Sequence, residues 1–593
     1  MKEIIPISSL DTVFEAPPSK AFTLRALFIS TLADGKSVLR NALNAEDQQH
    51  AMNALNSFGA KIRFENNNFI VKGTGGKLIS PKEPVFCGNS GVTTRFLLPI
   101  AALSKGDSVI DGDERMRQRP IEDLIYSIEK AGVKAKASSI GCPPVEVKGE
   151  SFEGGVTSIQ GDKSSQYLSS MLIASPYTKK GLLIDVEGEL KSKPYVDITI
   201  ECMKSFGVEV INRNYKEFFV KANKGYTAKD YFIEGDYSSA SYFFAAAAIT
   251  KGKVKVTNLN PDSAQGDKFF LDCLEEMGCE VNYGKNFVEV IGKELTGIKV
   301  DMGDYPDIVP TLAVVAAFAE GKTIIHNVAH LALKESNRLK TTAKNLMHLG
   351  VPAIAKIDSI EIVGKTPRGG EIETFKDHRI AMSFAIIGLT VKGIKINNPE
   401  VVEKSFPNFF KELEKAYLNN RKTNVALIGF RGTGKTQIGR RLAKRLNFKF
   451  IDTDKEIIKQ EGKSIPAIFT KIGELGFREL EKKEIKKATE LDDVCIACGG
   501  GVVLSKENIE NLKKKATVIL LEAEPERIYA RISRDKNRPA LTDKEGIEEV
   551  KHLLEERKEK YETSADFKIN TTVDSLNECT QKIMDILNEK ELL

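Results

Sequence analysis

A glycine followed by a short run of β-forming residues recurs six times in the first 400 or so residues of this chain, at intervals of about 70 residues. Each copy follows a segment rich in Ala and Leu, and the glycines are Gly35, Gly106, Gly181, Gly252, Gly321 and Gly393. Solenoid and propeller repeats are shorter, about 20 to 50 residues. The period therefore favours a duplicated α+β unit that is used six times and ends near residue 412.

A second glycine keeps the same rhythm. Gly59, Gly132, Gly207, Gly278 and Gly350 each follow a segment of helical composition and precede a new β-rich run. Glycine tolerates the left-handed conformation that closes many helices, so these positions predict helix ends. The rhythm stops before a short polar segment at 419–423. We therefore expect a first domain over 1–418, a linker over 419–423 and a second domain over 424–593.

The bulk composition indicates a globular protein with small ligands. The chain is 41% hydrophobic and 28% charged, and its formal net charge of +5 is too small to indicate nucleic-acid binding. The N-terminus lacks the apolar core of a signal peptide, and the longest apolar runs have about eight residues, far short of a membrane span. We expect a cytoplasmic, monomeric protein that binds neither nucleic acid nor membranes.

The eight cysteines are scattered along the chain, as is usual for reduced thiols. Cys495 and Cys498 form a CxxC, but they do so within VCIAC, a run typical of a strand. Residues three apart on a strand point to opposite faces of a sheet. We therefore interpret both as small buried side chains and not as a zinc or redox pair.

Several charged residues of the repeats fall where helices are expected to begin. The turn GNSG at 88–91 opens a helix that contains Arg95, and Arg119 precedes Pro120, which we expect at a first helical position. Asp377 is expected at an N-cap, with a histidine and an arginine in the following turn. Helix N-termini and arginines both attract anions. Several such positions, about one in each repeat, predict ligands that carry multiple negative charges.

The segments PPSKAFTLRALFIS, GNSGVTTR, RMRQRP, SSQYL, SKPYVDIT, YPD, KESNR, DHR and KSFP occur in this order over about 400 residues. Together they resemble 5-enolpyruvylshikimate-3-phosphate (EPSP) synthase. The resemblance implies two lobes of three repeats each, about 21–233 and 1–20 plus 234–418, which close around the substrates. It also implies transfer of the enolpyruvyl group of phosphoenolpyruvate to the 5-hydroxyl of shikimate 3-phosphate, with no cofactor. The alternative is the related enolpyruvyl transferase that acts on a UDP-sugar, although SSQYL and SKPY favour the shikimate enzyme.

The same resemblance implies a role for individual residues. Asp307 is expected to be the base for the 5-hydroxyl, and Glu335 the acid that protonates the methylene carbon. Lys20 is expected to touch both substrates and, with His378, to complete the catalytic set. The implied ligands of shikimate 3-phosphate are Arg25, Ser164, Ser165, Gln166, Ser192 and Lys334, and those of phosphoenolpyruvate are Arg119, Arg338, Arg379, Lys404 and the backbone at Gly91.

This chain departs from the family pattern at four positions. Ala21 stands where the family usually has a serine that donates to the phosphate, although we retain Ala21 among the substrate contacts. Val92 replaces a threonine in the loop near phosphoenolpyruvate, while His330 and Ala332 replace Asn and Arg. Loss of one hydrogen bond to a charged group costs about 1.5–3 kcal/mol. We expect weaker binding without loss of catalysis.

A phosphate-binding loop opens the second domain. The apolar run ending at Ile428 leads into GFRGTGKT at 429–436, and a helix with apolar residues at helical spacing is expected to follow. In such a loop backbone N–H groups surround the β-phosphate, Lys435 binds the β- and γ-phosphate oxygens, and the Thr436 hydroxyl binds Mg²⁺. The expected ATP contacts are Gly432, Thr433, Gly434, Lys435, Thr436 and Gln437. The loop alone fits a kinase, a GTPase, an ATPase motor or a nucleotide sensor.

The residues downstream decide between these classes. FIDTD predicts a strand that ends with Asp452 and Asp454 on one face, where the first would hold Mg²⁺ through water and the second would orient an acceptor hydroxyl. With Arg478 in GELGFRELE, the triple glycine of CGGGVV and Arg557 in RKEKY, the order and spacing resemble shikimate kinase over 424–590.

The resemblance to shikimate kinase implies a phosphate-transfer site. Arg478 and Arg557 would hold the shikimate carboxylate, Asp454 and Gly500 its hydroxyl side, and Arg538 would belong to the lid over ATP. The catalytic residues would be Lys435 and Asp454, with Mg²⁺ at Thr436 and Asp452. A nucleotide sensor without kinase activity is the remaining alternative for this half. If both halves are active, the chain phosphorylates shikimate and then uses the product, two consecutive steps toward chorismate.

Overall fold

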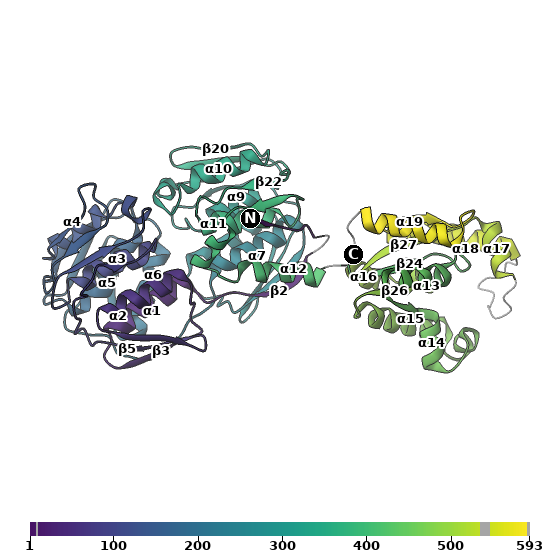
Figure 1. Ribbon diagram of the computed structural model, residues 1–593, viewed down its shortest axis with the longest axis horizontal. Coiled ribbons are helices and arrows are strands. Elements are labelled where there is room, and N and C mark those ends of the chain that lie inside the picture. Colours follow the sequence, from purple (N-terminus) through teal and green to yellow (C-terminus); the bar gives the residue numbers. More distant parts are fainter. Residues whose placement is uncertain (8–9, 421, 534–545, 590–593) are drawn as a thin grey trace. The chain divides into compact units, whose positions relative to one another are not determined.

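The computed structural model describes residues 1–7, 10–420, 422–533 and 546–589 (Figure 1). The chain divides into two compact units, Met1–Asn419 and Asn420–Leu593. Within the described ranges, every helix is too short or too polar to cross a membrane. The helix α12 (Phe409–Asn420) runs into the segment expected as linker, and the first strand of the second unit starts at Asn424.

The described part of the first unit contains six small sheets, each with a parallel strand pair at one edge. Three of them have the strand orders β14 (Asp230–Phe232), β3 (Lys36–Arg40), β5 (Asn68–Lys72), β4 (Lys61–Glu65); β6 (Val85–Phe86), β7 (Ser108–Asp111), β9 (Val145–Val147), β8 (Ala135–Lys136); and β10 (Gly155–Gln160), β11 (Leu182–Glu187), β13 (Glu217–Val220), β12 (Val210–Arg213). The other three are β2 (Asp11–Glu15), β15 (Lys253–Thr257), β17 (Phe287–Ile291), β16 (Glu280–Tyr283); β18 (Lys299–Asp301), β19 (Lys322–His326), β21 (Ser359–Val363), β20 (Ala353–Ala355); and β22 (Gly370–Ile372), β23 (Ile394–Ile396), β1 (Lys2–Glu3).

The six glycine-led runs form β3, β7, β11, β15, β19 and β23, one in each sheet, so the sequence prediction is confirmed. Their side chains alternate between buried and more exposed positions, as expected for a strand with one face on a core. The five glycines expected at helix ends all have positive φ angles, between +84° and +112°. Such angles favour glycine because it has no Cβ atom.

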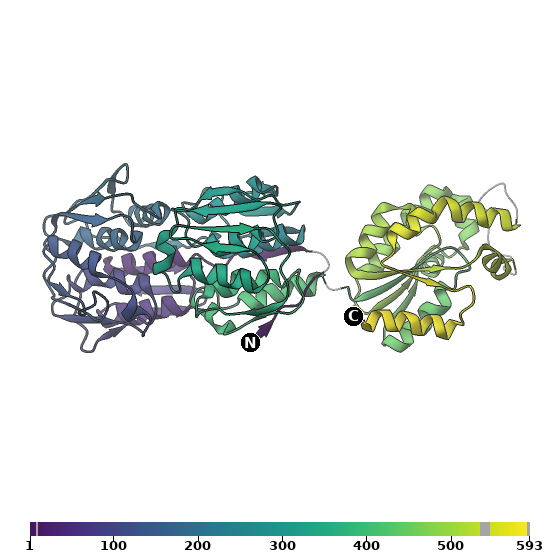
Figure 2. The same cartoon turned by 90° about the horizontal axis from the view of Figure 1, so that it is seen from above.

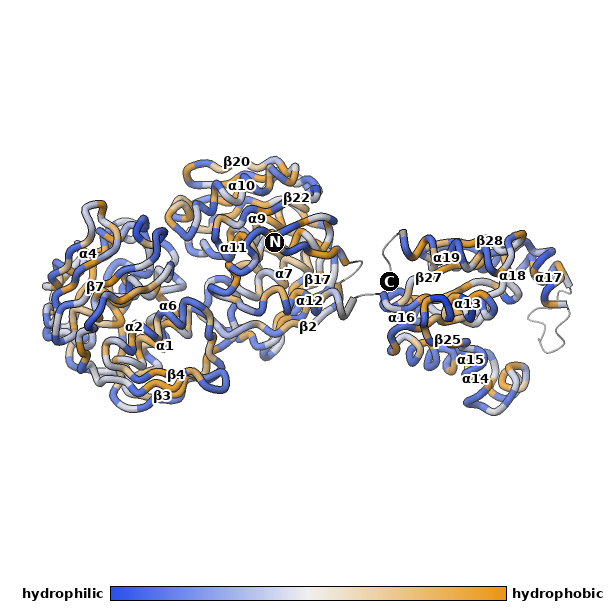
Figure 3. The backbone as a smooth tube through the Cα atoms, viewed as in Figure 1, coloured by the Kyte–Doolittle hydropathy of each residue, from blue (hydrophilic) through white to orange (hydrophobic). Residues whose placement is uncertain are grey.

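The repeats of the first unit contain helices of two kinds. The helices α1 (Lys20–Leu32), α3 (Gly91–Ala101), α5 (Ser165–Ala174), α7 (Tyr237–Thr250), α9 (Val309–Ala316) and α11 (His378–Ile387) are buried along nearly their whole length. The helices α2 (Glu46–Ser57), α4 (Glu122–Lys130), α6 (Lys193–Ser205), α8 (Phe269–Glu276) and α10 (Arg338–His348) bury one side only. In Figure 3 the hydrophobic segments run through the interior and the hydrophilic ones gather at the surface.

Two hydrophobic cores define two lobes within this unit. The first lobe has a core from residues 22–233, and the second lobe has a core from residues 4–16 and 237–416. The chain crosses between the lobes twice. It passes from β2, which pairs with β15 in the second lobe, into α1 and β3 of the first lobe, and it returns from β14, which pairs with β3, into α7 and β15. In each lobe, the strand next to a crossing forms the edge of a sheet by pairing with a strand distant in the sequence: β14 with β3 in the first lobe, and β2 with β15 in the second.

The second unit is a five-stranded parallel sheet with helices on both faces (Figure 2). The strand order is β25 (Lys449–Asp452), β26 (Val494–Ala497), β24 (Asn424–Ile428), β27 (Ala516–Glu522), β28 (Phe567–Asn570). The helices are α13 (Lys435–Leu446), α14 (Thr453–Glu461), α15 (Ile465–Thr489), α16 (Lys506–Lys515), α17 (Pro525–Ile532), α18 (Gly546–Ser564) and α19 (Leu576–Glu589). Apolar residues of α13 and α19 cover one face, and those of α15, α16 and α18 contribute to the core on the other.

Several predicted local features are confirmed and two are wrong. The eight cysteines are free and buried, and Cys495 and Cys498 lie in the cores on opposite faces of the sheet, as their spacing predicts. Pro120 is not at a first helical position, because α4 begins at Glu122 and the Pro120 carbonyl accepts a hydrogen bond from the Tyr167 hydroxyl at 2.8 Å. Asp454 does not share a strand face with Asp452. The strand ends at Asp452, whose side chain caps α14, and Asp454 lies in the first turn of that helix.

Candidate active sites

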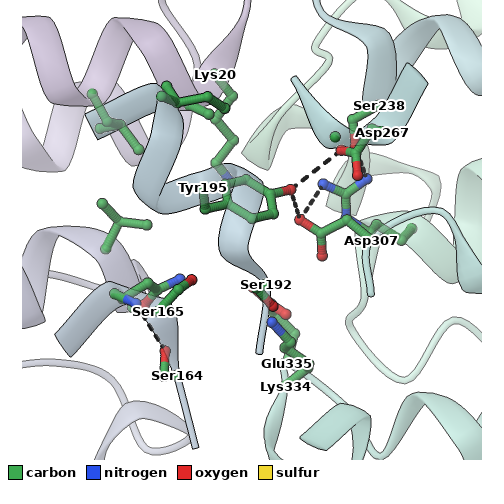
Figure 4. A pocket seen from close by; sticks show the side chains of 18 of the residues that line it. Lys20, Ser164, Ser165, Ser192, Tyr195, Ser238, Asp267, Asp307, Lys334 and Glu335 are labelled. Atoms are coloured by element: carbon green, nitrogen blue, oxygen red, sulfur yellow. Dashed lines mark hydrogen bonds and ion pairs between the residues drawn. The ribbon is translucent and has the colours of Figure 1, made fainter. Parts of the chain in front are cut away.

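The first site lies where the two lobes meet, and residues from both lobes line it (Figure 4). Nearly all of the residues expected for the transferase are in the lining: Lys20, Ala21, Arg25, Gly91, Arg119, Ser164, Ser165, Gln166, Ser192, Asp307, Lys334, Glu335, Arg338, His378 and Arg379. Lys404 is not in the lining. Its ammonium group lies behind Glu335, at 3.9 Å from that carboxylate, and donates to the Asn89 carbonyl at 2.7 Å.

Arg338 is the centre of a buried ion network. Its guanidinium group contacts Asp307 Oδ1 at 2.8 Å, Glu335 Oε2 at 2.7 Å and Asp377 Oδ2 at 2.9 Å, and its side chain is 1% exposed. Asp377 also caps α11 by accepting from the Arg379 backbone N–H, which confirms the predicted N-cap. Burial alone would raise the pKa of Glu335, but Arg338 and Lys404 outweigh it and lower that pKa well below its ordinary value. The network fixes both carboxylates expected to handle protons.

Asp307 lies between two arginines and a tyrosine. Its Oδ2 atom is 2.9 Å from the Arg379 guanidinium and 2.6 Å from the Tyr195 hydroxyl, and Figure 4 shows the Tyr195 hydroxyl facing the Asp307 carboxylate. Burial opposes ionisation, yet the nearby Arg379, Lys334 and Arg338 lower the pKa of Asp307 below its ordinary value. Asp307 is therefore a fixed, ionised hydrogen-bond acceptor in the absence of ligands.

A second ion network brings Lys20 to the site. The Lys20 ammonium is 2.6 Å from Asp47 Oδ2, and its backbone N–H donates to Asp236 Oδ2 at 2.9 Å at the start of α1. Asp47 lies in the first turn of α2. Burial by itself would raise the pKa of Asp47, and Lys20 and Lys404 together lower it. Burial, reinforced by Lys20 and Arg379, holds the pKa of His378 well below its ordinary value, so this imidazole is neutral.

The part of the cavity in the first lobe carries the groups expected for a phosphate. The Arg25 side chain is held by the Thr199 hydroxyl at 2.7 Å and the Tyr195 carbonyl at 2.9 Å, and burial lowers its pKa to about 10. Ser164 caps α5, and Ser164, Ser165 and Gln166 line the cavity, so the N-terminus of this helix, with its free backbone N–H groups, lies at the cavity. Ser192 has a left-handed backbone conformation, with φ +58°, at the start of α6. This conformation is uncommon for a residue other than glycine and is often found at binding sites.

Arg119 faces the turn that begins α3. A Cβ atom on Gly91 would lie 2.8 Å from an Arg119 nitrogen, so a larger residue at position 91 would displace the Arg119 guanidinium. The Arg119 Nε atom is buried and has no hydrogen-bond partner among the described residues. A buried polar group without a partner is rare in a folded protein and is a common feature of a site that awaits a ligand.

Ala21 and Val92, two of the positions that depart from the family pattern, both line the cavity with apolar side chains. His330 also lines it, with a buried Nε2 atom that has no partner in the described residues, and burial near Lys334 lowers its pKa to about 3. Sequence reasoning missed Asp47, Tyr195, Asp236, Ser238 and Asp267, all of which line the cavity. Only Tyr195 had a local signal, because it belongs to the segment SKPYVDIT.

The two lobes are joined by direct contacts around the cavity. Arg115 of the first lobe donates from Nε to the Glu335 carbonyl at 3.0 Å and from Nη2 to the Lys334 carbonyl at 2.9 Å. Lys191 donates to Asn327 Oδ1 at 2.7 Å. The contacts of Arg115 fix the backbone of two residues whose side chains line the cavity. The structure is therefore in a closed arrangement.

The second site is formed by the phosphate-binding loop of the second unit. Gly432 and Gly434 have φ angles of +85° and +99°, which other residues rarely adopt, and Lys435 donates to the carbonyls of Gly429 and Phe430 at 2.7 and 2.9 Å. Gly432, Gly434, Lys435, Thr436, Gln437, Asp452, Asp454, Arg478, Gly500 and Arg557 line one pocket. Thr433 is a buried residue of the loop and does not line the pocket. Arg538 lies outside the described residues.

The far end of this pocket carries two arginines around the triple glycine. Arg478 pairs with Glu481 at 3.0 Å, and a Cβ atom on Gly501 would lie 2.2 Å from the Arg478 guanidinium. The Gly500 carbonyl accepts from the Tyr561 hydroxyl at 2.5 Å and from Arg557 at 3.5 Å. The buried Arg557 Nε has no partner among the described residues. The pair of arginines suits a carboxylate.

The oxygens near the loop fit a magnesium ion. The Thr436 hydroxyl is 2.7 Å from Asp452 Oδ2, and Asp454 lines the same pocket. Hydroxyl and carboxylate oxygens are the ligand types that Mg²⁺ takes, usually one or two from protein and the rest from water and substrate phosphates. Sequence reasoning missed Arg531, whose guanidinium lines the pocket and donates to the Gly432 carbonyl at 3.2 Å.

Comparison with known proteins agrees with both sites. A sequence model of EPSP synthase (3-phosphoshikimate 1-carboxyvinyltransferase) matches residues 4–413, and one of shikimate kinase matches residues 431–588. The 3-phosphoshikimate 1-carboxyvinyltransferase of Methanothermobacter thermautotrophicus is 42% identical over 404 residues, covering 68% of this chain and 94% of the relative. That of Trichormus variabilis is 39% identical over 405 residues, covering 68% and 95%.

Solved structures share the fold of the first unit. An EPSP synthase from Acinetobacter baumannii superimposes with a TM-score of 0.60 at 26% identity, covering 70% of this chain and 97% of that one. An enolpyruvyl transferase from Streptomyces tendae, at 17% identity and a TM-score of 0.57 over 70% of this chain and 96% of its own, agrees in fold. The chain belongs to the EPSP synthase family and also carries a shikimate kinase domain, which makes it a bifunctional enzyme of the shikimate pathway.

Proposed function

We propose that the unit at 424–593 transfers the γ-phosphoryl group of ATP to the 3-hydroxyl of shikimate, and that the unit at 1–418 uses the product, shikimate 3-phosphate. In the second reaction the enolpyruvyl group of phosphoenolpyruvate is added to the 5-hydroxyl and phosphate leaves. The observation that carries the proposal is the convergence of the expected side chains, distant in sequence, on one cavity in each unit.

In the transferase, the two substrates would occupy opposite parts of the interlobe cavity. Arg25, Ser164, Ser165, Gln166, Ser192 and Lys334 are assigned to shikimate 3-phosphate, and Arg119, Arg338, Arg379, Lys404 and the Gly91 backbone to phosphoenolpyruvate. The unpartnered Arg119 Nε supports an anion at that end. Lys404 does not line the cavity, so we assign it an electrostatic role toward phosphoenolpyruvate and not a direct contact; its ammonium lies 3.9 Å from Glu335. Ala21 contributes its backbone only.

Proton transfer in the transferase is assigned to two carboxylates of the Arg338 network. Asp307 accepts the proton of the 5-hydroxyl. Glu335, which the network holds ionised without ligands, must first gain a proton; it delivers that proton to the methylene carbon and takes one back from the methyl group in the elimination. Lys20 lies beside both substrates and neutralises the phosphate oxygens. His378 is neutral, and neither of its ring nitrogens has a hydrogen-bond partner among the described residues, so it would orient a substrate oxygen. Positioned acids and bases of this kind contribute about 10²–10⁴-fold to a rate.

In the kinase, positioning and charge account for catalysis. Arg478 and Arg557 hold the shikimate carboxylate, and Gly500 leaves room for the ring. Asp454 orients the 3-hydroxyl toward the γ-phosphate. Lys435 leaves the loop carbonyls to bind phosphate oxygens. Thr436 and Asp452 would hold Mg²⁺, which would neutralise part of the negative charge of the ATP phosphates.

A single experiment on the full-length chain tests both activities. Excess EDTA is expected to abolish shikimate-dependent ADP formation and to leave phosphate release from supplied shikimate 3-phosphate and phosphoenolpyruvate unchanged. Kinase turnover that survives EDTA would remove the magnesium assignment. Binding of ATP without ADP formation under magnesium would favour a nucleotide sensor, and phosphate release with a UDP-sugar in place of shikimate 3-phosphate would favour the related transferase.

A further inference from the structure

The Tyr195 hydroxyl lies between two buried carboxylates in the transferase cavity. Its oxygen is 2.6 Å from Asp307 Oδ2 and 3.2 Å from Asp267 Oδ2, and Figure 4 shows both contacts as dashed lines. Asp267 lies in the segment that precedes α8, and its side chain lines the cavity. The three residues come from α6, from the segment before α8 and from the segment before α9, so tertiary structure alone brings them together.

One hydroxyl group has one proton to donate, and here two carboxylate oxygens compete for it. If both carboxylates are ionised, only one can accept from Tyr195, and the other faces an oxygen lone pair at 3.2 Å. The arrangement is satisfied when one carboxyl carries a proton. Asp307 is held ionised by Arg338 and Arg379, with contacts of 2.8 and 2.9 Å. A proton added to this group therefore belongs on Asp267 rather than on Asp307.

The surroundings of Asp267 agree with this distribution. Charged and titratable groups that face it are Asp307, Asp236, Arg379 and Tyr195, and the Ser238 hydroxyl is close by. Burial, together with the negative charge of Asp307, raises the pKa of Asp267 to about 7, and Arg379 opposes the shift without cancelling it. Asp307, between the same tyrosine and two arginines, has a pKa below its ordinary value. Transfer of a proton from Asp307 to Asp267 therefore lowers the free energy.

We propose that Asp267, acting through the Tyr195 hydroxyl, receives the proton that Asp307 takes from the substrate hydroxyl. The inference rests on the proposed role of Asp307. The substrate O–H bond breaks and its proton binds Asp307. Protonated Asp307 then donates to the Tyr195 oxygen while the tyrosine proton passes to Asp267. No electrons are gained or lost, and Tyr195 ends neutral. Asp307 is returned to its ionised state, paired with the arginines.

The proton is held on Asp267 only between the addition and the elimination. In the overall reaction the proton lost by the substrate hydroxyl leaves on the released phosphate. The same path therefore runs in reverse when phosphate departs. Asp267 is a positioning residue for the proton, and it must be ionised at the start of the cycle. The transferase rate is consequently expected to rise with pH through the titration of this group.

The test compares Asp267→Asn, Tyr195→Phe and the double variant in the full-length chain, with kcat for phosphate release measured from pH 5.5 to 9. Asp267→Asn is expected to lower kcat about 10- to 100-fold, within the range of acid–base effects, and to remove the rise near pH 7. The double variant is expected to match Tyr195→Phe alone, because Asp267 acts only through that hydroxyl. Asp272→Asn, an exposed position on α8, is the matched control and should retain both kcat and pH profile.

Calorimetric titration separates the relay from a binding or folding defect. Each single variant should bind shikimate 3-phosphate within threefold of the parent chain and unfold at a similar temperature. If Asp267→Asn does not fold, Tyr195→Phe decides the matter through the pH profile. Retention of kcat and of the rise near pH 7 in either variant would overturn the relay.

Asp307→Asn distinguishes the relay from the assignment on which it rests. An inactive Asp307→Asn beside a fully active Asp267→Asn would refute the relay and leave the role of Asp307 in place. Turnover by Asp307→Asn at the parental rate would refute both.

Discussion

Replacement of Arg115 by alanine is expected to open the transferase. The two hydrogen bonds from its guanidinium to the Lys334 and Glu335 carbonyls, at 2.9 and 3.0 Å, join the lobes directly. A hydrogen bond to a charged group is worth about 1.5–3 kcal/mol. Arg115 is partly exposed, so the lower end applies and the pair contributes about 2–3 kcal/mol to closure. At about 1.4 kcal/mol for each factor of ten, the ratio of closed to open enzyme falls about 30- to 150-fold.

The loss should be visible in the capture of phosphoenolpyruvate. If only the closed form completes the site, kcat/KM for phosphoenolpyruvate falls with the fraction of closed enzyme, by up to the same factor, whereas kcat falls less because bound substrates restore closure. Small-angle scattering of a transferase unit with and without substrates would report the change in shape. Arg115→Lys should recover part of the loss, since an ammonium group keeps the charge without the two-pronged geometry.

A matched control is two residues away. Arg117 is exposed and pairs with Asp111 in its own lobe at 2.5 Å, so Arg117→Ala removes an arginine from the same segment without touching the interlobe contact. This variant should keep kcat/KM within twofold of the parent chain. The reasoning fails if Arg115→Ala also stays within threefold, because closure would then not depend on these two hydrogen bonds.

Three further outcomes follow from the sites. Gly501→Ala would place a Cβ atom 2.2 Å from the Arg478 guanidinium, so KM for shikimate should rise tenfold or more while the transferase activity of the same chain is unchanged. Arg338→Met removes the guanidinium that three buried carboxylates share, which costs about 3–5 kcal/mol. Calorimetry should show the transferase transition lowered and the kinase transition in place. The pKa of Asp267 is about 7 in the folded chain and near its ordinary value of 3.8 when unfolded. Its contribution to stability is therefore full below about pH 4 and is lost as pH rises through about 7. The unfolding temperature of the transferase, measured from about pH 5 to 8.5, should fall less steeply with pH in Asp267→Asn than in the parent chain.

The features that the sequence predicts well are those with a local cause. A glycine with positive φ ends a helix whatever the rest of the fold does, and alternating residues on a strand follow from its period of two. The helix cap at Asp377 and the phosphate-binding loop are local in the same sense. Asp454 shows the limit. The DTD pattern fits an extended strand equally well, but Asp452 caps a helix and turns the chain within one residue.

Features that depend on distant segments had no local signal. The pairing of β2 with β15 and of β14 with β3 joins strands more than 190 residues apart, which no periodicity reveals. Asp267 is similar. Its neighbours Tyr195 and Asp307 are 72 and 40 positions away, and only folding makes them a single hydrogen-bonded group.

Each active site contains an arginine that is paired with carboxylates and another that is incompletely paired. Burial of a guanidinium group without a partner is costly, so Arg338 and Arg478 are paired with carboxylates of the protein even without ligands. Arg119 and Arg557 keep a buried Nε–H that has no partner among the residues described. An incoming anion gains most where a donor is unpaired, since it displaces no carboxylate. We therefore expect the paired arginines to contribute mainly to the geometry of each site and the incompletely paired ones to contribute most of the affinity for substrate anions.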